Sequence, residues 1–201
     1  MAEAGQEVRT YRALRAFHFG PSVTDELKRE FWQMVAPVAH RLAVGPYDLG
    51  EFTDPAFTHE IVVEDRTPVT QGPMRLDPAA EKWLLETWIK QQEAKGLIQK
   101  AGLYDICPFI TQLLLIPGTQ QGQPYRGVQN LVPLNKRTKV MRLPMTDVRR
   151  CKAAVGRADY ISQIDLKAGY YNVLLELASQ LLTAFATPGG VYYWKRMTQG
   201  L

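Results

Sequence analysis

Apolar residues at helical spacing predict an amphipathic helix near the N-terminus, over residues 24–42. They share one face of that helix and comprise Leu27, Phe31, Met34, Val35 and Val38. Ser22 and Asp25 have the spacing of a capping box at its start. Residues 1–20 show little periodicity, which indicates a loose arm before the helix.

A second helix is predicted from residue 77 onwards. Asp77 suits the N-cap and Pro78 the first helical position, because the N–H that proline lacks would have no partner there. Gly96 is placed to end the helix. Its buried stripe is formed by Leu84, Leu85, Trp88 and Ile89. The preceding residues 43–76 are interrupted by glycines and prolines, and predict an extended connector with at most one strand, at residues 61–63.

Short strands dominate the remainder of the chain. Residues 112–116 and 125–131 flank a turn-rich spacer and predict a hairpin with a mobile tip. Thr146 and Gly156 are placed as cap and stop of a helix over residues 146–155. Further strands are predicted at residues 160–166, 172–176, 183–185 and 191–195. This order indicates an α+β fold with an antiparallel sheet and flanking helices, not repeated βαβ units.

Composition adds broad limits. Hydrophobic residues make up 46% and charged residues 22% of the 201 residues, as is typical of a folded domain with an extension. No apolar run approaches the roughly 20 residues of a membrane span, and the N-terminus lacks the layout of a secretory signal. Cys107 and Cys151 have neither zinc-site nor disulfide-framework spacing. We therefore expect an intracellular protein, cytoplasmic or nuclear, with no membrane partner.

The net charge of +4 is unevenly distributed. Residues 1–70 are net acidic and residues 71–201 net basic. Residues 126–157 hold a single acid, Asp147, against nine bases. These are Arg126, Lys136, Arg137, Lys139, Arg142, Arg149, Arg150, Lys152 and Arg157. Such a run is either a solvated face or a groove that follows a phosphate backbone.

Asp165 is the first candidate for chemistry. It ends the apolar run 160–166 and precedes a turn that contains Gly169. A carboxylate at the end of a strand can point outward at a sheet edge, where a hard cation such as Mg²⁺ would find the oxygen ligands that it prefers. The alternative is an ordinary aspartate that caps the next turn.

The surroundings of Asp165 resemble the first carboxylate motif of reverse transcriptases from gypsy-class LTR retrotransposons and retroviruses. The segment that carries this resemblance is residues 162–170, SQIDLKAGY. Further segments in the same order resemble the family's flanking motifs: residues 48–50, 59–61, 95–98, 125–137, 183–194 and 197–201. The resemblance covers residues 40–201.

This resemblance implies a partial right-hand polymerase. Residues 77–201 would form the fingers and the first half of the palm, and residues 1–76 an N-terminal arm, helix and connector. The implied activity is RNA-directed DNA synthesis by two-metal nucleotidyl transfer, which makes the protein a transferase. Asp165 and the Leu166 carbonyl would bind Mg²⁺, two ions in the complete site. The implied partners are an RNA/DNA template-primer, a dNTP and the remainder of a Pol polyprotein.

The family's nucleotide-binding residues correspond to Arg126, Tyr170 and Gln199. Arg126 would bind the incoming triphosphate, for which a planar guanidinium is well suited, or it is a solvated hairpin residue. Tyr170 would lie under the nucleotide sugar, or it packs in the core. Gln199 would contact the incoming nucleotide. Contacts with the template backbone would come from Lys136, Arg137, Lys139 and Arg142.

Several positions depart from the family pattern. Leu115 or Ile116 occupies the position of the family's fingers lysine. At three further positions where the family has polar or charged residues, this chain has Asn130, Val132 and Leu182. No aspartate follows Asp165 in this chain, so one carboxylate would have to hold two ions. We therefore expect no polymerase activity from the isolated chain. Two alternatives remain open: a non-catalytic nucleic-acid-binding remnant of a retroelement, and a truncated chain that scarcely folds.

Overall fold

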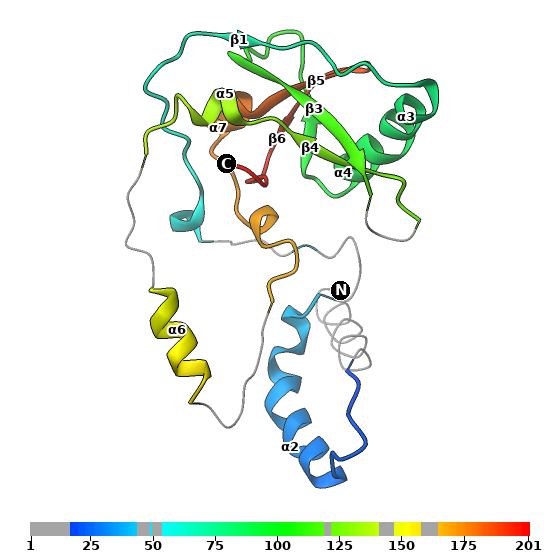
Figure 1. The fold of residues 1–201 in the computed structure, drawn as a ribbon, viewed down its shortest axis with the longest axis vertical. Coiled ribbons are helices and arrows are strands. Elements are labelled where there is room, and N and C mark those ends of the chain that lie inside the picture. The colour runs from blue at the N-terminus through cyan, green and yellow to red at the C-terminus, as the bar shows by residue number, and fades with distance from the viewer. Residues whose placement is uncertain (1–16, 44–48, 50–53, 119–121, 141–146, 158–164) are drawn as a thin grey trace. The chain divides into compact units, whose positions relative to one another are not determined.

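The computed structural model describes residues 17–43, 49, 54–118, 122–140, 147–157 and 165–201 (Figure 1). The chain divides into two compact units, Met1–Glu51 and Phe52–Leu201. Each unit is described by itself below.

The first unit contains helix α2 (Asp25–Val35), followed by the 3₁₀ helix η1 (Ala36–Arg41). The predicted helix is confirmed, but its cap is Thr24, not Ser22. The Thr24 hydroxyl accepts a hydrogen bond from the Leu27 amide at 3.3 Å. No residue of α2 is buried. Its Phe31 and Trp32 rings pack edge-to-face with each other and with Phe17 and Phe19, which precede the helix.

The second unit is built on one six-stranded sheet. Its strand order is β1-β3-β5-β6-β2, and β4 also pairs with β3. The strands are β1 (Val69–Thr70), β2 (Ile98–Lys100), β3 (Phe109–Pro117), β4 (Tyr125–Gln129), β5 (Ala184–Thr187) and β6 (Gly190–Trp194). The α+β class is confirmed. The sheet was predicted to be antiparallel, but it is mixed. Strand β3 pairs in parallel with β1 and with β5, which are remote from it in sequence.

The connector contributes to this sheet. Strand β1 lies within residues 43–76 and donates through the Val69 amide to the Pro108 carbonyl at 2.9 Å. Residues 61–63 form no strand and make only an isolated bridge, from Val63 to Thr138. The 3₁₀ turn η2 (Pro55–Phe57) precedes them. The boundary at residue 77, between the N-terminal residues 1–76 and the polymerase part of the chain, stays a prediction.

The helix that begins after Asp77 is confirmed. The Asp77 carboxylate accepts from the Ala79 and Ala80 amides, each at 2.9 Å. The helix runs through α3 (Pro78–Trp83), a π-helical segment η3 (Leu84–Ile89) and α4 (Lys90–Ala94). Leu84, Trp88 and Ile89 are buried as predicted, and Leu85 is half-buried. Gly96 follows with φ +66°, the left-handed conformation that ends helices.

The hairpin β3–β4 is also confirmed, with register from Leu113 opposite Gln129 to Pro117 opposite Tyr125. Gly118 begins its turn and donates to the Pro124 carbonyl at 3.0 Å. A Cβ atom at residue 118 would overlap the Gln123 carbonyl oxygen, so this position requires glycine. Residues 119–121, at the predicted mobile tip, lie outside the described residues.

The last third of the chain departs most from the predictions. Residues 172–176 form no strand: the 3₁₀ helix η4 (Gly169–Asn172) is followed by isolated bridges at Leu174 and Leu175. The hairpin of β5 and β6 is confirmed. Most of the predicted strand 160–166 lies outside the described residues. Short helices complete the unit: α5 (Val132–Asn135), α7 (Leu177–Gln180) and the 3₁₀ turn η5 (Leu181–Thr183).

Helix α6 (Val148–Val155) lies within the predicted helix 146–155. Its cap is Asp147, whose carboxylate accepts from the Arg149 amide at 2.9 Å. Thr146, the predicted cap, lies outside the described residues, whereas Gly156 ends the helix as predicted.

A buried glutamine joins the hairpin to the rest of the sheet. The Gln129 amide nitrogen on β4 donates to the Thr111 hydroxyl at 2.8 Å and to the Thr183 carbonyl at 3.0 Å. Its oxygen accepts from the indole N–H of Trp194 on β6 at 2.6 Å. Gln129 is only 8% exposed, so these bonds form away from water and hold β4 in one position against β5 and β6.

Candidate nucleotide-binding site

A cavity of about 390 Å³ opens between the end of the long helix, the hairpin β3–β4 and two turns near the C-terminus. It is lined by Trp88, Gln92, Lys95, Gly118, Gln123, Arg126, Gly127, Tyr171 and Gln199. None of these residues is acidic. Ligand sites in proteins commonly occupy about 300 to 1,000 Å³, so the cavity is large enough for a small ligand.

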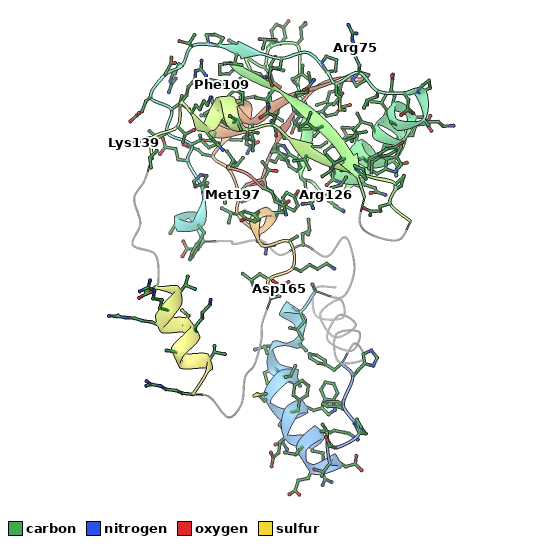
Figure 2. All side chains as sticks on the ribbon, viewed as in Figure 1. Arg75, Phe109, Arg126, Lys139, Asp165 and Met197 are labelled. Atoms are coloured by element: carbon green, nitrogen blue, oxygen red, sulfur yellow. The ribbon has the colours of Figure 1, made fainter. Side chains whose placement is uncertain are left out.

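Two of the three predicted nucleotide-binding residues meet in this cavity. Arg126 lies on β4 (Figure 2). Gln199 lies 73 positions later, after β6, and its side-chain oxygen accepts a hydrogen bond from the Arg126 guanidinium at 2.8 Å. Among the described residues, Arg126 has no carboxylate partner. Its guanidinium therefore keeps donors available for an anion.

The third predicted residue, Tyr170, lies elsewhere. It is 49% exposed and lines a separate apolar hollow of about 340 Å³ with Leu166, Gly169, Val173 and Met197. The neighbouring Tyr171 faces the cavity instead. The predicted residues thus fall into two groups, Arg126 with Gln199 and Leu166 with Tyr170.

Tyr171 was not singled out from the sequence, where its neighbour matched the family motif. Its ring stacks on Trp194 with centroids 5.6 Å apart and an interplanar angle of 9°. Burial raises the pKa of its hydroxyl, while a hydrogen bond with Thr198 and the charge of Arg126 act in the opposite direction. Tyr171 therefore lines the cavity as a neutral side chain, and the charge of Arg126 acts on its hydroxyl.

Lys95 and Gln92 are the other residues that sequence reasoning missed. Lys95 caps the C-terminal end of α4. Burial lowers the pKa of its ammonium group, and so does the positive charge of Lys167. Lys167 lies two positions after Asp165 along the chain. The sequence feature that could have identified Lys95 is Gly96, because Gly96 ends the helix and so places Lys95 at the helix end.

Asp165 itself is exposed to solvent. Across the part of the chain that the structure describes, no group of three His, Cys, Asp or Glu side chains could hold a metal ion. Two Mg²⁺ ions would need several carboxylate oxygens, and Asp165 with the Leu166 carbonyl supplies too few. The described residues do not fit a complete two-metal site.

The chain is similar to several curated polyproteins of retroelements. It is 37% identical over 116 residues to an enzymatic polyprotein of cassava vein mosaic virus, a match that covers 56% of this chain and 18% of the relative. It is 26% identical over 117 residues to the retrovirus-related Pol polyprotein of transposon 412 from Drosophila melanogaster, across 56% of this chain and 10% of the relative. The chain is a homologue of retroelement Pol polyproteins. It spans less than a fifth of the length of these two relatives.

Solved structures agree on the fold of this Pol homologue. The foamy virus protease-reverse transcriptase in complex with an RNA/DNA hybrid matches all of the chain with a TM-score of 0.68 at 16% identity. A mutant of the prototype foamy virus enzyme matches with a TM-score of 0.72 at 18% identity. The chain covers 25% of each. The fold is thus that of part of a retroviral reverse transcriptase. No protein-family model matches the chain.

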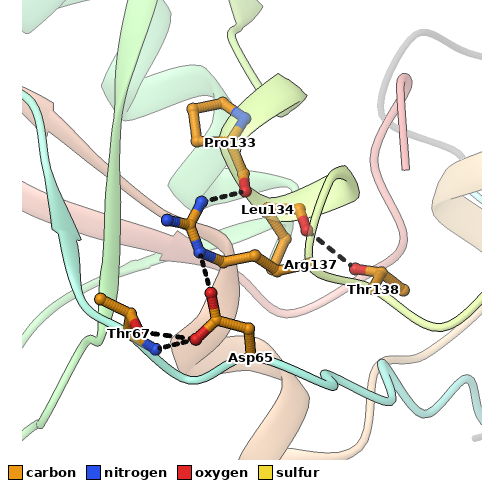
Figure 3. A network of polar contacts seen from close by, with 6 residues as sticks. All are labelled: Asp65, Thr67, Pro133, Leu134, Arg137 and Thr138. Atoms are coloured by element: carbon orange, nitrogen blue, oxygen red, sulfur yellow. Dashed lines mark hydrogen bonds and ion pairs between the residues drawn. The ribbon is translucent and has the colours of Figure 1, made fainter.

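The predicted nucleic-acid-binding residues of this Pol homologue differ in their surroundings. Lys136 and Lys139 are exposed. Arg137 is engaged: its guanidinium donates to the Asp65 carboxylate and to the Pro133 carbonyl, each at 3.1 Å (Figure 3). Arg142 lies outside the described residues. Within the described chain, no helix has both the length and the hydropathy to cross a bilayer.

The acid beside Arg137 is held by several donors. Hydrogen bonds from the Thr67 hydroxyl and amide lower the pKa of Asp65, and the charge of Arg137 lowers it as well. Arg137 thus ties the segment after β4 to the connector, and its charge is partly neutralised before any nucleic acid binds.

Gly127 forms the contact between hairpin and helix at the cavity wall. A Cβ atom at this position would lie 2.7 Å from two indole carbons of Trp88, which is buried against Phe185 and Trp194. We therefore expect Gly127→Ala to lower the free energy of unfolding by about 1–3 kcal/mol through overpacking, measured by urea denaturation.

Gly72→Ala is the matched control for this substitution. A Cβ atom at Gly72 meets no atom within 4 Å, so its effect should stay within about 0.5 kcal/mol. Equal unfolding curves for the two variants would show that the Trp88 contact is not tight.

Proposed function

We propose that this chain forms the fingers and the first half of the palm of a retroelement reverse transcriptase, which extends a DNA primer on an RNA template. The observation that carries the proposal is the hydrogen bond between Arg126 and Gln199 in one cavity whose described lining residues include no acid. The two residues were selected separately for nucleotide contacts, and folding brings them together across 73 positions.

In this proposal each residue has a distinct task. Arg126 binds phosphate oxygens of the incoming dNTP through its planar fork, and Gln199 holds that fork in place. Tyr170 contacts the sugar from the neighbouring hollow. Lys136 and Lys139 contact the template-primer backbone without reading sequence. Two of the foamy virus structures that share this fold are complexes with an RNA/DNA hybrid and with double-stranded DNA, which supports a duplex partner.

Asp165 would supply one carboxylate to a Mg²⁺ site in the assembled polymerase. Because this carboxylate stands alone among the described residues, the isolated chain should show no primer extension with an RNA template, dNTPs and Mg²⁺. Magnesium-dependent extension by the purified chain would contradict this expectation.

The activity itself is tested in a chimaera. The segment of the transposon 412 Pol polyprotein that aligns with this chain is replaced by the chain, and RNA-templated extension is measured. The matched control carries the corresponding segment of the gypsy Pol polyprotein, a relative that is 34% identical to this chain over 68 residues. We expect extension from both chimaeras. Activity with the gypsy segment and none with this chain would overturn the proposal.

A second function remains in competition: a non-catalytic nucleic-acid-binding remnant of a retroelement. The exposed Lys136 and Lys139, together with the lone Asp165 carboxylate, favour it. This function predicts that the isolated chain binds an RNA/DNA duplex with an affinity that falls steeply with salt and does not depend on Mg²⁺ or Asp165. Such binding, combined with an inactive chimaera, would select this alternative.

A further inference from the structure

The cavity contains a second cation that the reverse transcriptase resemblance does not assign. Lys95 reaches it from the end of α4, whereas Arg126 reaches it from β4. The cross-strand partner of Arg126 on β3 is Ile116, so strand β3 supplies no charge directly opposite this guanidinium. Helix and hairpin thus provide one cation each to the same cavity.

A buried amide points to a ligand at the same place. Gln92, one helical turn before Lys95, lines the cavity and is only 8% exposed. Its side chain makes no hydrogen bond within the described part of the chain. The polar atoms of this side chain are not among the fully buried, unpaired atoms of the described residues, so the amide stays open to the cavity and can bond a polar ligand there.

The charges define the class of that ligand. The cavity combines two cations with the side-chain amides of Gln92, Gln123 and Gln199, and none of its described lining residues is acidic. Burial lowers the pKa of the Lys95 ammonium group, and the positive charge of Lys167 lowers it further. A polyanion would relieve this repulsion, and a neutral ligand would not. A chain of phosphate groups has the charge and the acceptor oxygens that such a site prefers.

We infer that Lys95 is a second phosphate-binding residue of the nucleotide site and contacts the triphosphate from the end of α4. This inference rests on the proposed function for the identity of the nucleotide, but phosphate binding can be measured separately. Gln92 donates to the same ligand through its amide. Lys95 thereby provides the cation that strand β3 lacks.

The test is titration calorimetry of the full chain with sodium tripolyphosphate in EDTA, followed by a dNTP under the same conditions. We expect Lys95→Gln to weaken binding of both probes by about tenfold, as the loss of a charge-assisted hydrogen bond implies. Lys95→Arg should retain most of the affinity and so exclude misfolding as the cause. Lys90→Gln is the matched control, because Lys90 is exposed on the same helix and does not line the cavity.

The outcomes separate this inference from the proposed function. Arg126→Gln should also weaken binding by about tenfold. If Arg126→Gln weakens binding and Lys95→Gln leaves it unchanged, the role of Lys95 is overturned while the nucleotide site stands. Equal losses of affinity in Lys95→Gln and Lys90→Gln would show that Lys95 acts only through general electrostatics. That result would also overturn its role as a phosphate-binding residue. No binding by the unsubstituted chain would overturn both.

Discussion

Asp165→Asn in the active transposon 412 chimaera should reduce primer extension by about a thousandfold. Asparagine keeps the shape of the side chain but replaces an anionic ligand by a neutral amide, which binds hard cations more weakly. Metal stabilisation of the transition state is worth several kcal/mol, and about 1.4 kcal/mol corresponds to a factor of ten in rate. The measurement is the single-turnover rate at saturating dNTP, with RNA template and Mg²⁺.

Asp147→Asn is the matched control for this substitution. Asp147 is an exposed carboxylate that caps α6, and asparagine caps helices equally well, so activity should not change. Circular dichroism of both variants monitors folding. If Asp165→Asn retains extension within about tenfold of the unsubstituted chimaera, Asp165 is not the carboxylate on which the reaction depends.

Gln129→Leu should lower the free energy of unfolding of the isolated chain by about 3 kcal/mol. The substitution leaves the indole N–H of Trp194 and the Thr111 hydroxyl without their buried partner, and each such loss costs about 1–3 kcal/mol. Leucine cannot bond the Thr183 carbonyl either. Urea denaturation followed by tryptophan fluorescence measures the change.

The control for Gln129→Leu is Gln99→Leu on the edge strand β2. Gln99 is exposed, so the same change of side chain should shift stability by no more than about 0.5 kcal/mol. A difference below about 1 kcal/mol between the two variants would show that the hairpin does not depend on this network. Because Arg126 lies on the strand that Gln129 anchors, Gln129→Leu should also weaken tripolyphosphate binding.

Most of the secondary structure could be predicted from residues that are close to one another in sequence. Asp77, Pro78 and Gly96 specify the ends of one helix through caps and left-handed backbone, which act over a few residues. The two hairpins followed from turn residues between apolar runs. The prediction was wrong at Ser22, because Thr24, two positions later, caps the helix. It was also wrong at residues 172–176, because this segment finds partners far away in sequence.

Tertiary structure decided which side chains share a site. Sequence resemblance selected Arg126 and Gln199 separately, whereas their hydrogen bond exists only because β4 and the turn after β6 meet. Lys95 lies in the segment 95–98 that resembles the family, but neither it nor Gln92 was predicted to contact a nucleotide. They became candidates because the end of a helix faces the hairpin across a cavity.

The sequence by itself determined the helix ends, the hairpins and the resemblance to retroelement reverse transcriptases around Asp165, because these depend on residues near one another in the chain. Only the fold made the sheet mixed, placed Tyr171 and not Tyr170 on the cavity, and engaged Arg137 with Asp65. Pairings between remote strands and the direction of a side chain depend on long-range packing, which short-range patterns do not specify.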